Sequence, residues 1–129
     1  MAKKIYIAGP MRGYKFYNFP AFDAAEERLR RLGYDVVNPA QLDRMRGIHP
    51  ESFPEDWDWH KTPEGFDLKE VAMACLRHVI ECDGVLTLKG WTLSRGAVTE
   101  HYFAGWVGVP SYAEQINDIG LVSLFGDPS

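Results

Sequence analysis

Two short stretches of the sequence carry side chains that could bind and cleave a small anionic substrate. The first is KKIYIAGPMRGY, residues 3–14, where alternating apolar and polar side chains run into a loop with Gly9, Arg12 and Gly13. The two glycines let the backbone approach a ligand closely, and the Arg12 guanidinium is a forked donor suited to phosphate or carboxylate. The loop matches neither a Walker sequence nor G-x-G-x-x-G. A solvated surface arginine is the alternative interpretation of Arg12.

The second stretch is SRGAVTEHYFAG, residues 94–105. Ser94 is placed to cap a helix, so that its hydroxyl and the free N–H groups after it would form an anion site. Glu100 lies about one turn further in, where the helix dipole favours the ionised carboxylate that a nucleophile needs. A carboxylate that only complements the helix dipole is the alternative interpretation of Glu100.

Strands that alternate with helices must position these residues. Apolar periodicity predicts strands at about 4–8, 34–39 and 84–88, candidate strands in VPSYA and LVSLF, and helices at about 18–32, 67–80 and 97–107, with Asn18 as the cap of the first helix. This order predicts an α/β fold, in which residues 1–129 form a single-domain three-layer α/β/α sandwich. The sheet is expected to be Rossmann-like or flavodoxin-like, parallel, and built of about five strands.

Ligands of such sheets bind beyond the carboxyl ends of the strands. The loops that leave the first three strands, GPMRGY, NPAQ and KGWTLSRG, are therefore expected to converge on one crevice. Residues 41–65 show no clear periodicity and are predicted to be an irregular insert, which is typical of a lid or a binding loop.

Composition excludes several classes of protein. Apolar residues make up 46% of the chain and charged residues 25%, which is ordinary for one globular domain. The net charge of −4 argues against a general nucleic-acid binder, and no apolar run approaches the roughly 20 residues of a membrane span. The start MAKKIYIAG lacks the apolar core of a signal peptide, so a cytoplasmic protein is expected. Cys75 and Cys82 are interpreted as buried free thiols, and no metal or cofactor is expected.

Most of residues 3–110 resembles the nucleoside 2-deoxyribosyltransferase-like superfamily, and most closely its branch of small, often phage-encoded proteins of uncharacterised function. The resemblance rests on IYIAGPMRGYKFYNFPAFDAAEERLRRLGYDVVNPA and on CDGVLTLKGWTLSRGAVTEHYFA. In that superfamily a glutamate attacks the anomeric carbon of a deoxyribose and expels the nucleobase. Glu100, four residues after Gly96, matches this glutamate, and Tyr6 matches a first-strand tyrosine that lies near it.

The same stretches are similar to the 2′-deoxynucleoside 5′-phosphate N-hydrolases, whose first loop reads Y-x-x-G-S-I-R-G. Those enzymes hold the 5′-phosphate with this arginine and with a serine six residues before the nucleophile. Arg12 and Ser94 match these two residues, whereas Pro10 replaces the loop serine. The resemblance therefore implies N-glycosidic cleavage or transfer on a 2′-deoxynucleoside or its 5′-monophosphate, in a homodimer or a higher homo-oligomer.

Six residues are predicted to bind this small molecule, of which the resemblance implies Arg12 and Ser94: Gly9, Arg12, Gly13, Trp91, Ser94 and Gly96. Trp91 and the insert residues Trp57 and Trp59 could stack on a nucleobase, although aromatic side chains at this density more often pack in a core or an interface. Neither nucleic acid nor a membrane is expected as a partner.

The residue that would donate a proton to the departing base in the family is not matched in this sequence. The family commonly has an aspartate eight residues before the aspartate that precedes the third strand, and counting back from Asp83 gives Cys75. Other acids lie in the insert, where they could close over the site, or at the start of the next helix, where they also fit a capping box: Asp56, Asp58, His60, Asp67 and Glu70.

Three hypotheses of function remain at this point. The first is an N-glycosidase or deoxyribosyltransferase with Glu100 as nucleophile. The second is a nucleotide-binding module of the same fold that has lost turnover, which Cys75 would permit. The third is a structural protein whose insert binds a partner.

Overall fold

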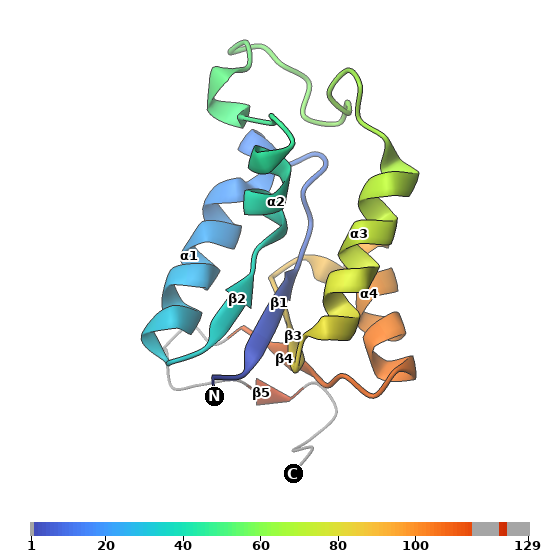
Figure 1. Ribbon diagram of the computed structural model, residues 1–129. Helices are drawn as coiled ribbons and strands as arrows, with labels where there is room; N and C mark the ends of the chain where they lie inside the picture. The colour runs from blue at the N-terminus through green and yellow to red at the C-terminus, as the bar shows by residue number, and fades with distance from the viewer. Residues whose placement is uncertain (1, 115–121, 124–129) are drawn as a thin grey trace.

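A computed structural model of the chain describes residues 2–114 and 122–123 (Figure 1). In chain order the elements are β1 (Lys4–Ala8), η1 (Lys15–Asn18), α1 (Phe19–Arg31), β2 (Asp35–Val37), α2 (Pro39–Met45), η2 (Pro50–Ser52), α3 (Leu68–Glu81), β3 (Gly84–Thr87), η3 (Trp91–Leu93), α4 (Arg95–Trp106), β4 (Ser111–Ala113) and β5 (Val122–Ser123). The predicted α/β fold is confirmed.

The five strands form one sheet in the order β2-β1-β3-β4-β5. The first four of these strands are parallel, whereas β5 pairs antiparallel with β4. The prediction of a wholly parallel sheet is therefore wrong at its last strand. Only residues 114–121 separate β4 from β5, and a parallel return needs a crossover of about a dozen residues or more.

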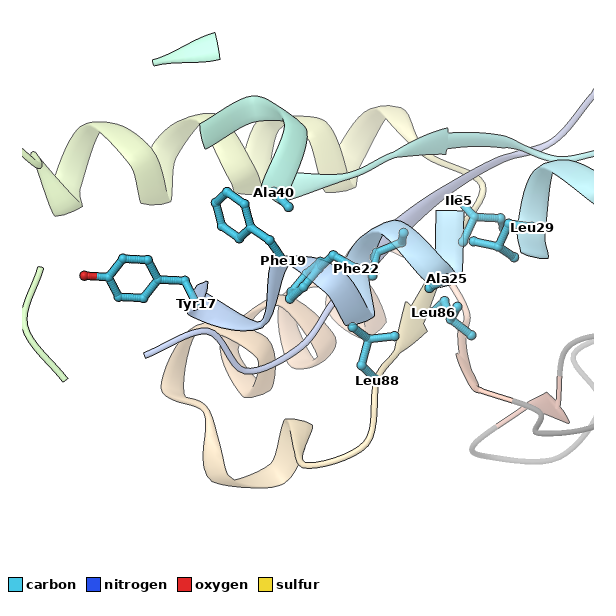
Figure 2. Packing of buried hydrophobic residues seen from close by; sticks show 10 residues of the cluster. Ile5, Tyr17, Phe19, Phe22, Ala25, Leu29, Ala40, Leu86 and Leu88 are labelled. Atoms are coloured by element: carbon cyan, nitrogen blue, oxygen red, sulfur yellow. The ribbon is translucent and has the colours of Figure 1, made fainter. Parts of the chain in front are cut away.

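Side chains alternate across β1 and divide the core into two layers. Ile5 and Ile7 pack with α1 and with Ala40 of α2 (Figure 2), whereas Tyr6 and Ala8 face α3 and α4. This alternation is the two-residue period of a strand buried on both faces. The three-layer sandwich predicted from the sequence is confirmed, and the α3–α4 layer is the one that receives Tyr6.

The segment that leads into α1 has an unusual backbone. Phe16, Tyr17 and Asn18 are consecutive left-handed residues with φ of +54°, +50° and +62°. The Asn18 side chain makes no cap and instead donates a hydrogen bond to the Pro10 carbonyl at 2.9 Å, so the predicted cap is wrong. Each left-handed non-glycine residue costs about 1–2 kcal/mol, and buried contacts must offset that cost. The buried Tyr17 supplies them, because its hydroxyl donates to the Lys61 carbonyl at 2.5 Å.

The segment predicted to be an irregular insert begins with a helix. Asn38 caps α2, because its Oδ1 accepts from the Ala40 N–H at 2.9 Å, and Pro39 occupies the first turn. A helix of seven residues is too short for periodicity to reveal it. Past η2, the chain returns to the first loop, where the Gly13 N–H donates to the Trp59 carbonyl at 2.8 Å.

Both helices on the other face begin where the sequence places their caps. Asp67 Oδ1 accepts from the Lys69 and Glu70 N–H groups at 3.1 and 3.2 Å, and Ser94 Oγ accepts from the Ala97 N–H at 3.2 Å. The predicted capping roles of Asp67 and Ser94 are confirmed. No helix within the described residues is long and apolar enough to cross a membrane.

The fold predicts opposite effects for two Gly→Ala substitutions. A Cβ on Gly9 would lie 2.8 Å from Cβ of the buried Leu88, so Gly9→Ala should lower the free energy of unfolding by about 1–3 kcal/mol. Gly105, in α4, has no atom within 4 Å of a built Cβ, so Gly105→Ala should raise it by about 0.5–1 kcal/mol. Urea unfolding of the two variants measures both changes. Equal effects of the two would contradict the packing role of Gly9.

Candidate active site

The Tyr6 hydroxyl donates a hydrogen bond to Glu100 Oε2, which joins the centre of the sheet to α4. Tyr6 is fully buried in β1, where it pairs with Val37 of β2 and Val85 of β3. Glu100 lies in the second turn of α4, the helix that follows β3, and is only partly exposed. The carboxylate therefore lies against the sheet at the middle residue of β1 and does not extend into bulk solvent.

Burial determines the protonation of this pair. It raises the pKa of Glu100 to about 7, against a smaller lowering by the Tyr6 hydrogen bond. Burial, with the Glu100 charge, also raises the pKa of Tyr6 well above its ordinary value. The expectation that the helix dipole keeps Glu100 ionised is therefore wrong in sign, because desolvation outweighs the dipole one turn into the helix. At neutral pH Tyr6 remains a donor, and Glu100 is present in both forms.

Cys75 of α3 packs against the buried cluster that contains Tyr6. Burial, with smaller contributions from the charges of Glu100 and Asp43 and against a lowering by Tyr6, raises the pKa of this thiol to about 11. The thiol therefore stays neutral and is a weak acid. At the position where the family resemblance implies an aspartate, the structure places no group that could protonate a departing base at neutral pH.

Asp43 of α2 is a buried carboxyl that the sequence analysis did not identify. Its exposed fraction is 8%, and burial raises its pKa to about 6, while Arg46, whose Nη1 lies 3.4 Å from Oδ1, lowers it. Asp43 lies in α2, just past the second of the three loops expected to converge. Its place in the sequence, five residues after the Asn38 cap, was the signal that could have identified it.

Arg12 lines a hollow beside Asp43. The hollow has a volume of about 70 Å³ and is lined by Met11, Arg12, Tyr17, Asp43, Ile48, Lys61, Thr62 and Pro63. Arg12 is exposed and makes no hydrogen bond or ion pair with any residue that the structure describes. The structure therefore brings together Arg12, Asp43 and the insert residue Lys61 on one side, and Tyr6, Glu100 and Cys75 on the other.

The glycines of the first loop lie close to other residues of the chain, so a bound ligand is not the only reason for a residue without a side chain there. Gly9 lies against Leu88, and Gly13, with φ of +87°, lies where an added Cβ would be 3.0 Å from His60 Nε2. A Cβ on Gly90 would lie 2.6 Å from the Tyr14 hydroxyl, so the first and third loops also touch. Gly96 differs from these glycines, because the nearest atom to a Cβ added there would be Ser94 Oγ, at 4.0 Å. The α4 N-terminus is thus open at Gly96.

Trp59 and Trp91 pack against neighbouring aromatic rings. Trp59 stacks on Phe53 with centroids 5.7 Å apart and meets the Tyr17 ring edge-on at 4.9 Å. Trp91 lies 4.7 Å from the ring of buried His101. The core-packing interpretation of these aromatic residues is the one the contacts support.

The other acidic candidates have local roles. Asp58 lies in the insert, is exposed, and holds His60 Nδ1 at 3.2 Å. Asp83 accepts from the Lys4 N–H at 2.8 Å, at the far end of β1. Among the residues that the structure describes, no cluster of three His, Cys, Asp or Glu side chains could hold a metal ion.

The raised pKa of Glu100 predicts a pH-dependent stability. A carboxyl with a pKa of about 7 in the folded chain and an ordinary value of 4.5 contributes stability below pH 4.5 that is lost as the pH rises through 7. Glu100→Gln should therefore gain up to about 3 kcal/mol of unfolding free energy relative to the parent between pH 4.5 and pH 8. Tyr6→Phe removes the hydrogen bond that lowers the pKa of Glu100. The loss of stability with rising pH should therefore continue to higher pH in this variant than in the parent. Urea unfolding at several pH values measures both, and parallel curves for parent and Glu100→Gln would refute the burial of this charge.

Comparison with known proteins places the chain among related sequences and folds. No curated protein matches it. A 2-deoxyribosyltransferase from the psychrotolerant bacterium Bacillus psychrosaccharolyticus, described as a biocatalyst for nucleoside synthesis, has a similar structure with a TM-score of 0.55 and 22% sequence identity. The match covers 85% of this chain and 70% of that one and shows a shared fold. The family model described as a domain of unknown function, DUF4406, matches residues 3–111, and the chain therefore belongs to that family.

Proposed function

We propose that the protein cleaves or transfers the N-glycosidic bond of a 2′-deoxynucleoside or its 5′-monophosphate, with Glu100 as nucleophile. The observation that carries this proposal is the contact between Tyr6 of the parallel strand β1 and Glu100 of α4. The shared fold with a 2-deoxyribosyltransferase supports it.

The chemistry follows from the geometry of this pair. N-glycosidic cleavage passes through an oxocarbenium-like state, which a carboxylate below the sugar can stabilise or trap as an ester. Tyr6 holds Glu100 Oε2, which leaves Oε1 to face the anomeric carbon. Water or a second base then attacks that carbon and releases Glu100. The partial burial of Glu100 favours cleavage of the glycosidic bond, since a desolvated carboxylate interacts more strongly with the developing positive charge of the sugar.

A 5′-phosphate has candidate anchors in Arg12 and at the start of α4. Arg12 has no partner within the described residues, so its guanidinium is available to an anion. The Ser94 hydroxyl accepts from the Ala97 N–H and retains its own proton to donate. Open space at Gly96 lets a phosphate approach the first N–H groups of α4.

A nucleotide-binding module without turnover is the second candidate. The observation that favours it is the neutral Cys75 thiol beside Tyr6, with a pKa of about 11, where catalysis would call for an acid. This candidate keeps the roles of Arg12 and Ser94 and removes the role of Glu100 in bond cleavage.

Base release from a panel of deoxynucleosides and their 5′-monophosphates, with and without a second free base, separates these candidates. Glu100→Ala should lower the rate of release by roughly 10³-fold or more. Arg12→Ala should raise KM for monophosphates by about 10- to 100-fold, the effect of losing one charged hydrogen bond, and leave nucleosides unchanged. Arg30→Ala, on the outer side of α1, is the matched control. Binding without release, weakened by Arg12→Ala, would support the module and refute the enzyme.

We also propose that the protein is a homo-oligomer that associates through α3 and α4. These two helices pack against each other and carry five of the ten large apolar side chains that are exposed among the described residues: Leu68, Met73, Ile80, Tyr102 and Trp106. Trp106, with an exposed fraction of 84%, is the largest of them. Apolar side chains gathered in this way are typical of an interface.

Light scattering after gel filtration tests the oligomer. The parent chain should have a mass of at least twice 14.7 kDa, and Trp106→Glu should shift it toward the monomer, because a buried charge disfavours association. Leu32→Glu, on an exposed residue of α1, should leave the mass unchanged. A monomeric parent chain at micromolar concentration would refute the proposal.

A further inference from the structure

The proposed reaction needs an acid that the Tyr6–Glu100 pair does not contain. The leaving nitrogen of a nucleobase accepts a proton as the C1′–N bond breaks. Tyr6 already donates to Glu100, and Cys75 is too weak an acid. The insert acid Asp58 is exposed and directed at His60. A donor from another element near this pair would supply the missing proton.

Asp43 is placed to meet this need from α2. The charges of Asp43 and Glu100 both raise the pKa of the Cys75 thiol, so both carboxyls lie within electrostatic range of this side chain. Asp43 is more than nine-tenths buried, which favours its neutral, proton-carrying form. Its nearest partner is Arg46 at 3.4 Å, a distance too long for a strong hydrogen bond.

The hollow beside Asp43 has the chemistry of a nucleobase pocket. Its walls include the apolar side chains of Met11, Ile48 and Pro63, and Asp43 is its buried acid. A volume of about 70 Å³ is far below that of a usual small-molecule pocket, so the hollow accepts the edge of a ring and not a whole nucleotide. Arg12, one of the candidate phosphate anchors, also lines it.

We propose that this hollow receives the edge of the nucleobase and that Asp43 is the general acid that protonates it. The inference rests on the proposed N-glycosidic reaction. A Glu100 oxygen forms a bond to C1′ while the C1′–N bond breaks, and the bonding electrons and the Asp43 proton pass to the base nitrogen. Asp43 is left as a carboxylate. It then takes a proton from the attacking water, or from the N–H of a second base, as Glu100 is released.

The two carboxyls set the pH dependence of this reaction. Glu100 must be ionised, and its neighbours are Tyr6 of β1 and Cys75 of α3. Asp43 must be protonated, and it is faced by Arg46 after α2, Cys75 of α3, and Arg12 and Lys61 across the hollow. With pKa values of about 7 for Glu100 and about 6 for Asp43, kcat/KM should have its maximum between these two values.

A substrate whose leaving group needs no proton tests the role of Asp43. Asp43→Asn keeps the shape of the side chain and removes its acidic proton. It should lower kcat on a deoxynucleotide by about 10²- to 10⁴-fold and on 4-nitrophenyl 2-deoxyribofuranoside 5-phosphate by less than about five-fold, because nitrophenolate departs as an anion. Asp35→Asn, at the opposite end of the sheet, is the matched control. Circular dichroism confirms that each variant folds.

The intact chain gives a second measurement that does not depend on a variant. Its kcat/KM should fall at high pH with the deoxynucleotide and stay level with the nitrophenyl substrate. If Asp43→Asn lost equal activity on both substrates, the proposal would be overturned. It would also be overturned if the variant changed only KM for phosphorylated substrates, because the hollow would then hold phosphate. A parent chain that releases neither leaving group refutes the proposed function itself, whereas full activity of Asp43→Asn on the deoxynucleotide refutes only the role of Asp43.

Discussion

The structure depends on one contact, between a phenol at the centre of β1 and a carboxyl of α4. Removing Glu100 from water has a free-energy cost, which its raised pKa reports, and the sheet and helix must hold the two groups together against it. β1 does so by register, since a shift of one residue would turn Tyr6 toward α1. α4 does so by close approach, because the side chains it buries against the sheet, Ala97 and Ala104, are small. The core thus positions this pair.

The first loop is the junction of the site. It touches the third loop where Gly9 meets Leu88 and where Tyr14 meets Gly90, and it is bonded to the insert through Gly13. Each of these contacts needs a residue without a side chain at the point of approach. The strained residues before α1 serve the same junction, because their conformation buries Tyr17 beneath the insert. In the sequence these glycines suggest a ligand, but in the structure they let the protein's own loops approach one another. The ligand-binding surface results from how these loops meet.

Local signals in the sequence predicted local structure well. The helical periodicity and the caps Asp67 and Ser94 depend on residues within four positions of each other, and the structure has them as predicted. Three features depended on distant neighbours and were not predictable in this way. The antiparallel β5 depends on chain length between strands, the protonation of Glu100 depends on burial by other elements, and Asp43 gains its role only when α2 lies beside α3. The contact between Tyr6 and Glu100 was implied by the family resemblance alone, because no spacing links positions so far apart.

The neutral thiol of Cys75 is consistent with an acid on the other side of it. A carboxyl at that position would add a third titratable acid near Glu100 and Asp43, and like charges close together disfavour one another's ionisation. Cys75 stays uncharged, so it adds no charge beside either carboxyl. Arg12 lines the same hollow as Asp43, so a phosphate bound to Arg12 would bring negative charge to that hollow. Negative charge near a carboxyl favours its protonated form, which is the form of Asp43 that departure of a base requires.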